Sequence, residues 1–276
     1  LLARLLKGCP EVQVEESMTL ARNKALSEGV SGTRFVPVPS PVTALRRFKD
    51  RDEIAGIEAA LRLTEEVMVY TAGLIRPGMR EREVAAAMEH YARIKGAEGA
   101  SFPTIVASGP RSSLPHGEAS GRSIGAGELV LFDFGFVIDG YCSDFTRVLW
   151  TGNRVPPRIR RVWALVAEAQ QTGFAALKAG VPAAEPDLQV RDFFRRARVL
   201  ARYEHSLGHG VGREIHEAPR LSYRSEEVLE AGMVVTVEPG LYYPGKFGIR
   251  LEDMALVTAT GARRLTDFPL EIACTG

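Results

Sequence analysis

Three of the chain's five histidines lie within thirteen residues, in the segment HSLGHGVGREIHE at positions 205–217. Imidazole binds metals readily and exchanges protons near neutral pH, so this spacing indicates a metal site or acid–base chemistry. A single histidine on an apolar face is more often a buried residue with an ordinary hydrogen bond. The other two are His116, in LPHGEAS, and His90, which we expect to be exposed on a helix without a role.

The segment 128–150 is a predicted β-hairpin that carries an acid on each arm. Its Asp139-Gly140 pair is typical of a two-residue turn, which places residue 133 opposite residue 146. Side chains alternate along a strand, so Asp133 and Asp144 then point to the same face as diagonal neighbours.

The segment 233–258 is a second apolar hairpin with the same property, because Glu238 and Glu252 lie fourteen residues apart and can share one face. Four inward carboxylates without a lysine nearby are costly to bury unless positive charge meets them. Two divalent cations would neutralise them, and His209 is the best candidate to complete the ligands.

An oxygen-rich ligand set of this kind suits Mn²⁺, Co²⁺ or Zn²⁺ better than a thiolate-type zinc site. Two such ions about 3.5–4 Å apart can share a bridging water, lower its pKa and polarise a carbonyl. A lone aspartate in a strand is more often a turn or edge residue. The repetition of the acid-bearing hairpin, together with the histidine cluster, favours the metal site.

The elements that position these acids also repeat. Asp133 and Glu238 are 105 residues apart, and each hairpin follows two predicted helices. A capping box of Asp50 and Glu53 begins the first helix. The expected fold class is α/β (α+β), with a strand at 101–109 and helices from Asp50 to the RPGM segment and at 80–95, 156–180 and 187–201.

Composition excludes several classes of protein. With 45% apolar and 25% charged residues and a net charge of +1, the chain reads as globular. The basic RIRR segment at 158–161 is better explained as a solvated helix face than as a nucleic-acid surface. Three distant cysteines offer no disulfide framework, which favours the cytoplasm, and no apolar run approaches the ~20 residues of a membrane span.

Asp133 and Asp144, eleven residues apart, are followed in order by GHGVGREIHE and VEPGLYY…GIRLED. These motifs resemble those of the pita-bread metallopeptidases, which include methionine aminopeptidase, aminopeptidase P and prolidase, with creatinase as a non-peptidase relative. The resemblance covers about 46–276 and implies a catalytic domain of two pseudo-symmetric helix-helix-hairpin halves around a curved antiparallel sheet. Residues 1–45 resemble the tail of an N-terminal domain with its linker, a domain that often supports homodimerisation.

The resemblance also implies a role for each residue of the motifs. Five of them would bind two metal ions, with Asp144 and Glu252 bridging both, and Glu238 would carry the proton from the bridging water. His205 and His216 would reach the substrate and stabilise the oxyanion, and His116 would lie near the scissile nitrogen. The implied metal ligands are Asp133, Asp144, His209, Glu238 and Glu252.

Three features separate the subfamilies. The histidine pair His205 and His209 resembles the proline-specific members, and so does Arg250, near the substrate end, for which the alternative is an exposed strand arginine. The short interval between Glu238 and Glu252 resembles prolidase. We therefore expect a Mn²⁺-dependent Xaa-Pro dipeptidase acting on short Xaa-Pro peptides. Aminopeptidase P acting on longer peptides is the alternative, and a non-catalytic binding module or a creatinase-like enzyme is disfavoured because those relatives lose the metal ligands.

Overall fold

The computed structural model describes residues 1–275, apart from the side chain of Pro41. The chain forms two compact units, Leu1–Arg46 and a second unit that begins at Arg47. In the first unit two strands pair in parallel, with Pro37 opposite Val14. The elements of this unit are α1 (Leu2–Leu5), β1 (Glu11–Glu15), α2 (Leu20–Gly29), β2 (Arg34–Val38) and α3 (Pro41–Arg46).

The first half of the second unit consists of two helices followed by a long hairpin. The predicted capping box is confirmed, since Asp50 accepts from the backbone N–H of Glu53 while the Glu53 side chain accepts from that of Asp50. The elements are α4 (Arg51–Leu74), α5 (Glu81–Ile94), β3 (Gly99–Ala100), β4 (Ile105–Ser108), the 3₁₀ turn η1 (Gly109–Ser113), β5 (Leu129–Phe134), β6 (Phe136–Ile138), β7 (Tyr141–Cys142) and β8 (Phe145–Trp150).

The second half repeats this order. Two helices precede a second long hairpin, with a short strand pair inserted between them that carries the histidine cluster. The elements are α6 (Pro157–Ala176), α7 (Glu185–Arg196), η2 (Leu200–Arg202), β9 (Gly208–Gly210), β10 (Glu217–Leu221), β11 (Val234–Val237), β12 (Gly240–Tyr243), β13 (Phe247–Arg250), β14 (Asp253–Val257) and β15 (Ala262–Arg264), and the C-terminal strand β16 (Ala273–Cys274) returns to the first half.

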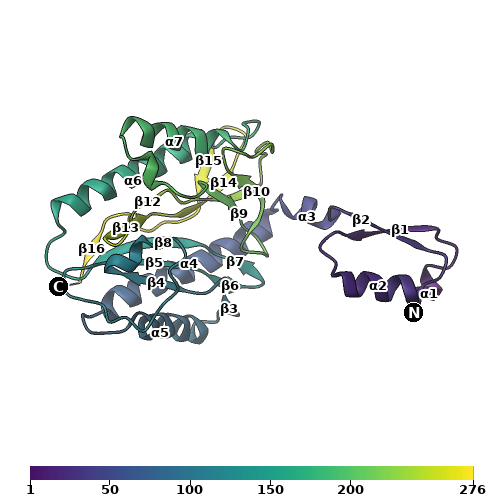
Figure 1. The fold of residues 1–276 in the computed structure, drawn as a ribbon, viewed down its shortest axis with the longest axis horizontal. Helices are drawn as coiled ribbons and strands as arrows, with labels where there is room; N and C mark the ends of the chain where they lie inside the picture. The colour runs from purple at the N-terminus through teal and green to yellow at the C-terminus, as the bar shows by residue number, and fades with distance from the viewer. Residues whose placement is uncertain (276) are drawn as a thin grey trace. The chain divides into compact units, whose positions relative to one another are not determined.

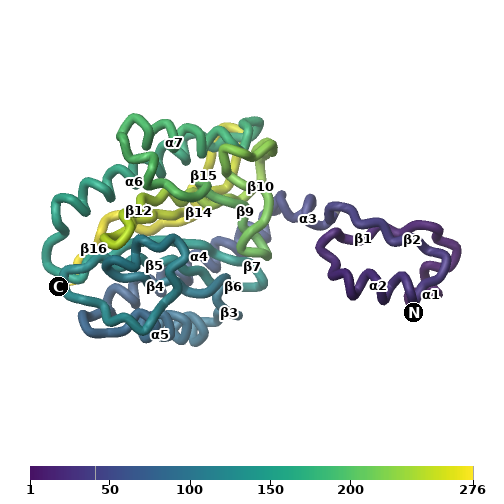
Figure 2. Tube along the Cα trace, in the orientation of Figure 1, coloured from purple at the N-terminus to yellow at the C-terminus, as the bar shows by residue number. Residues whose placement is uncertain are grey.

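The halves lie against each other through their strands (Figures 1 and 2). The first contributes the sheet β16-β8-β5-β4 and the second the sheet β10-β9-β11-β14-β15. An antiparallel bridge between Thr146 and Glu252 joins the sheets. Pairing is antiparallel in both sheets except for β16, which runs parallel to β8. In Figure 1, α4 and α5 cover the outer side of the first half and α6 and α7 that of the second.

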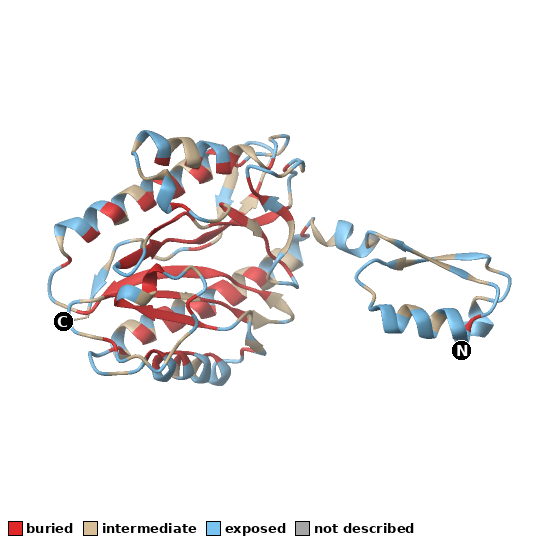
Figure 3. Cartoon of the chain, viewed as in Figure 1, coloured by how far each residue is buried: buried red, intermediate tan, exposed pale blue. Residues whose placement is uncertain are grey.

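The central strands are largely buried (Figure 3), and alternation along β5 sends its side chains into two different hydrophobic clusters. On β5, Val130 and Phe132 pack with α4 and α5, whereas Leu129 and Leu131 face the core shared with α6, α7 and the second hairpin. Asp133 follows Leu131 by two positions, so its side chain points toward the second half. The burial pattern thus aims the first acid at the interface of the halves.

Some element ends differ from the prediction. The helix expected at 156–180 ends at Ala176, and the one expected at 187–201 is Glu185–Arg196. The strand expected at 101–109 is only Ile105–Ser108 and runs into the η1 turn. In the described part of the chain, no helix combines the length and apolar character needed to cross a membrane.

Candidate metal centre and its cavity

The first hairpin has the predicted register. Asp139 and Gly140 both have positive φ, 51° and 74°, as a two-residue type I′ turn requires. Ile138 lies opposite Tyr141 and Asp133 opposite Thr146.

The second hairpin keeps one register across two short ladders. Val237 lies opposite Asp253 and Gly240 opposite Arg250, so Glu238 and Glu252 face each other across the interval. The Thr146 hydroxyl donates to Glu252 Oε2 at 2.6 Å. The acids of the second hairpin therefore meet those of the first at the junction of the sheets.

The histidine cluster brings an imidazole to these acids. His209 lies on β9, and its Nε2 is 3.5 Å from Asp144 Oδ2 and 3.4 Å from Glu238 Oε1. Three potential ligand atoms lie within 4.8 Å of one another, one each from Asp144, His209 and Glu252. A cavity of about 810 Å³ opens onto all five predicted ligands: Asp133, Asp144, His209, Glu238 and Glu252.

The carboxylates are poorly satisfied by protein groups. Within the described chain, one buried oxygen each of Asp133, Asp144 and Glu252 has no hydrogen-bond partner. Burial, reinforced by neighbouring carboxylates, raises the pKa of Asp144 and of Glu252 well above their usual range. Burial also raises the pKa of Glu238 to about 8, against the opposing charge of Arg250. Orphaned buried oxygens of this kind fit divalent cations, which would supply the missing partners.

The His209 ring is oriented as a metal ligand requires. Its Nδ1 lies 3.0 Å from the Gly210 carbonyl oxygen, so Nδ1–H donates there and leaves the Nε2 lone pair toward the acids. Burial lowers the pKa of His209 to about 4, which keeps the ring neutral at pH 7. Gly208 allows β9 to lie close to β11, because a Cβ on Gly208 would lie 2.1 Å from the Thr236 carbonyl oxygen.

Arg250 corrects one premise of the sequence argument. The sequence argument counted only lysine as a nearby cation and placed Arg250 at the substrate end, yet the Arg250 guanidinium is buried and pairs with Asp133. It also donates to the Tyr242 hydroxyl at 2.7 Å and to the Pro115 carbonyl at 3.2 Å. The alternative of an exposed strand arginine is therefore wrong, since the side chain is 3% exposed.

The other predicted histidines also line the cavity. His205 lies with Nδ1 2.8 Å from the Ser206 carbonyl oxygen and Nε2 2.8 Å from the Tyr242 hydroxyl, and burial lowers its pKa to about 3. The His216 ring packs edge-on against that of His209, with centroids 4.2 Å apart. His116 lies in the loop that follows η1. His90 is exposed on α5, as expected.

The sequence argument missed Tyr242 and Arg220. Tyr242 connects His205 to Arg250, and strand alternation from Glu238 could have placed it on the same face. Arg220 also lines the cavity and is exposed. It follows His216 by four positions in HEAPRL, a spacing that carried no signal of its own.

Known proteins match this arrangement along nearly the whole chain. Residues 55–259 match the family described as metallopeptidase family M24. The chain belongs to this family, and its fold is the pita-bread fold predicted from the motifs.

Individual relatives sharpen the comparison. The chain is 38% identical to the Xaa-Pro dipeptidase of Pyrococcus furiosus over 97% of its own length and 77% of that protein. Among solved structures it is similar to the Xaa-Pro dipeptidase from Bacillus anthracis, with 39% identity, a TM-score of 0.95 and coverage of 99% of this chain and 77% of that one. It is also similar to an X-Pro aminopeptidase from Thermotoga maritima, with 37% identity, a TM-score of 0.93 and coverage of 99% and 78%.

Proposed function

We propose that this chain is a dinuclear metallopeptidase that hydrolyses the Xaa-Pro bond at the N-terminus of short peptides, with Xaa-Pro dipeptides as its main substrates. The observation that carries the proposal is the cavity itself, where four carboxylates and one imidazole from both halves converge beside three further histidines. The Xaa-Pro dipeptidase relatives supply the substrate class.

The metal ligands in this proposal are the five residues that meet at the junction of the sheets. Two divalent ions, when bound there, supply a nucleophilic water of lowered pKa and polarise the substrate carbonyl. Their acid-rich surroundings favour Mn²⁺, with Co²⁺ or Zn²⁺ as alternatives. The ligands are Asp133, Asp144, His209, Glu238 and Glu252.

Glu238 is the proposed proton carrier. Its carboxylate lines the cavity within 3.4 Å of His209 Nε2, where it can accept the proton of the nucleophilic water and return it to the departing ring nitrogen of proline. His216 is kept neutral because burial lowers its pKa. Its ring N–H can then donate to the oxyanion that develops on the carbonyl, while His116 contacts the leaving-group side.

The enzyme cannot recognise the Xaa-Pro bond through a hydrogen bond from its amide N–H, because the proline nitrogen carries no hydrogen. The apolar side of the cavity, which includes Phe102 and Ile105, suits the ring, and a cation suits the carboxylate that follows it. We assign this contact to Arg250 with His205. Four of the five N–H groups of Arg250 already have acceptors among the described residues, which leaves one for substrate.

The test of the function is metal-dependent cleavage. Protein stripped with chelator should regain hydrolysis of Ala-Pro and Gly-Pro with two equivalents of Mn²⁺, as metal analysis and kinetics would record. If none of Mn²⁺, Co²⁺ and Zn²⁺ restores cleavage, the proposed peptidase activity is rejected. Because the Thermotoga maritima enzyme is an X-Pro aminopeptidase, aminopeptidase P activity is the second candidate. Faster turnover of Xaa-Pro-Pro than of Xaa-Pro would select it.

The assignment of Arg250 has a separate test. Arg250→Ala should raise KM for Gly-Pro and Ala-Pro. Arg220→Ala is the comparison, because Arg220 is an exposed residue that lines the same cavity. An unchanged KM in Arg250→Ala together with a raised KM in Arg220→Ala would transfer the carboxylate contact to Arg220.

We also propose a homodimer in the cytoplasm. The cytoplasmic proposal is supported by Cys9, Cys142 and Cys274, which are free thiols and suit a reducing compartment. The dimer is supported by the likeness of residues 1–45 to the end of an N-terminal domain. Light scattering on the purified chain, with a monomer mass as the contrary result, tests the dimer.

A further inference from the structure

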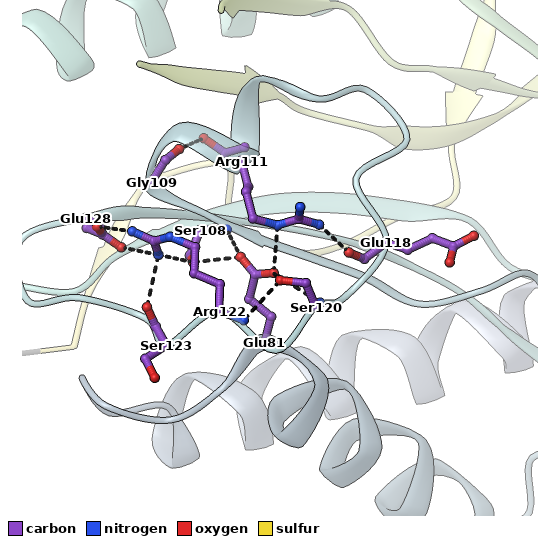
Figure 4. Close-up of polar contacts among 10 residues, drawn as sticks. Glu81, Ser108, Gly109, Arg111, Glu118, Ser120, Arg122, Ser123 and Glu128 are labelled. Atoms are coloured by element: carbon purple, nitrogen blue, oxygen red, sulfur yellow. Dashed lines mark hydrogen bonds and ion pairs between the residues drawn. The ribbon is translucent and has the colours of Figure 1, made fainter. Parts of the chain in front are cut away.

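Among the buried acids outside the metal centre, Glu81 is enclosed by hydrogen-bond donors from both ends of one loop. Glu81 is the first residue of α5, and its side chain is fully buried. Its Oε1 accepts from the backbone N–H and hydroxyl of Ser108 at 2.8 and 2.7 Å. Its Oε2 accepts from Ser120, through the backbone N–H at 3.1 Å and the hydroxyl, and from Arg111 Nε at 2.9 Å. Figure 4 shows the carboxylate between these groups.

The two serines are the two ends of one loop. Ser108 ends β4 and Ser120 lies twelve residues later, so Glu81 fastens both ends with one carboxylate. We call the segment between them, 109–119, the His116 loop. Arg111 braces it from within, since its NH2 donates to the Glu118 carbonyl at 2.6 Å.

The far side of the His116 loop contacts the metal centre. Arg250, which pairs with Asp133, donates to the Pro115 carbonyl. The backbone N–H of Gly248 donates to the Ser112 hydroxyl at 3.0 Å. Across the described chain, no hydrogen bond holds the His116 ring itself, so its place in the cavity wall depends on how the loop is held.

We propose that Glu81 is the positioning residue of the His116 loop and thereby sets the place of His116 in the cavity. The catalytic consequence rests on the proposed function, whereas the structural consequence does not. A carboxylate offers only acceptors and meets five donors here, two of them backbone N–H groups that cannot reverse. An amide in its place would turn an NH2 group toward donors at one end of the loop.

The first test measures the loop directly. In Glu81→Gln, amide hydrogen exchange of the peptide spanning 109–122 should accelerate by at least about tenfold, the factor for 1.4 kcal/mol of lost protection. Glu89→Gln is the matched control, since Glu89 is exposed on the same helix. Unchanged exchange in Glu81→Gln would overturn the proposal. If Glu81→Gln does not fold, Ser120→Ala, which removes one donor, should accelerate exchange of the same peptide to a smaller extent, and an unchanged rate in that variant would equally overturn it.

The second test asks whether Glu81 acts through His116. Misplacement of an active-site group by about 1 Å lowers a rate by about 100-fold, so Glu81→Gln should reduce kcat more than it changes KM. In a His116→Ala background the same substitution should cause little further loss. Equal losses in both backgrounds would show that Glu81 does not act through His116.

A third measurement does not depend on activity. The ring signals of His116 in a histidine-labelled protein should change position in the NMR spectrum of Glu81→Gln at a fixed pH, while those of exposed His90 stay unchanged. If the wild-type protein proves inactive on Xaa-Pro substrates, the function fails, but amide exchange and the His116 ring signals still decide the role of Glu81. Unmoved His116 signals would refute it.

Discussion

Glu81 and Glu252 are both fully enclosed glutamates, yet their surroundings are opposite. Glu81 accepts five hydrogen bonds, two from backbone N–H groups. These hydrogen bonds lower its pKa below the usual value although burial alone would raise it. Glu252 accepts from Thr146 through one oxygen, its other oxygen has no partner in the described chain, and its pKa is raised. The difference separates an acid that the fold completes from one that it leaves for a ligand.

The largest effect expected from this contrast is on metal binding. Glu252→Gln keeps an oxygen to accept from Thr146 but loses the charge. Mutation of a residue that hydrogen-bonds to a metal ligand lowers metal affinity or activity by about 10–100-fold. Loss of a ligand itself should therefore lower kcat/KM by more than about 100-fold. Metal content after dialysis should also fall below that of the wild type, and Glu89→Gln should match the wild type in both measurements. Full activity at wild-type metal content would remove Glu252 from the ligands.

The same substitution at the two sites should have opposite effects on stability. Glu81→Gln leaves buried donors without acceptors and should lower the free energy of unfolding by about 1–3 kcal/mol. Glu252→Gln relieves the crowding of carboxylates and should raise the Tm of the metal-free protein at pH 8. Chelator-treated samples in thermal melts provide the measurement. A shift of the same sign at both positions would erase the distinction between the two acids.

The sequence alone predicted the features of the fold and site that local residues determine. The Asp139-Gly140 turn determines the register of the first hairpin, and strand alternation then aims Asp133 inward. The capping box at Asp50 likewise fixes the start of α4. Helix ends were less predictable. For example, α6 stops at Ala176, before the glycine that marks the following turn.

The remaining features depend on contacts between distant segments. The partner of Arg250 is Asp133, 117 residues away, and nothing local to GIRLED indicates whether that arginine turns inward. Glu81 reads in the sequence only as an acid in the first turn of a helix. Its importance arises from Ser108, Arg111 and Ser120, which the fold brings to it from 27 to 39 residues away.

The smallest effect expected is the pH dependence that Glu238 contributes to the metal-free protein. With a folded pKa of about 8 against an ordinary glutamate value of 4.5, the native state holds a proton that the unfolded state has lost. Stability should therefore fall as pH rises through this window, by at most about 1.4 kcal/mol per pH unit for one group. His205 and His209, with folded pKa values of about 3 and 4, oppose this trend mainly below about pH 7, where an unfolded histidine with the ordinary pKa of 6.5 takes up a proton.

Melting the metal-free protein between pH 7.5 and 8.5 isolates the acids, because His205 and His209 are neutral in the native state and an unfolded histidine is largely neutral above about pH 7.5. The Tm should decline across this range, and Glu238→Gln should make the decline shallower. Added Mn²⁺ should stabilise the protein more at pH 8 than at pH 6.5, since metal and protons compete for the same oxygens. A Tm that rises over this interval, or a slope that Glu238→Gln leaves intact, would mean that the fold satisfies Glu238 as it satisfies Glu81.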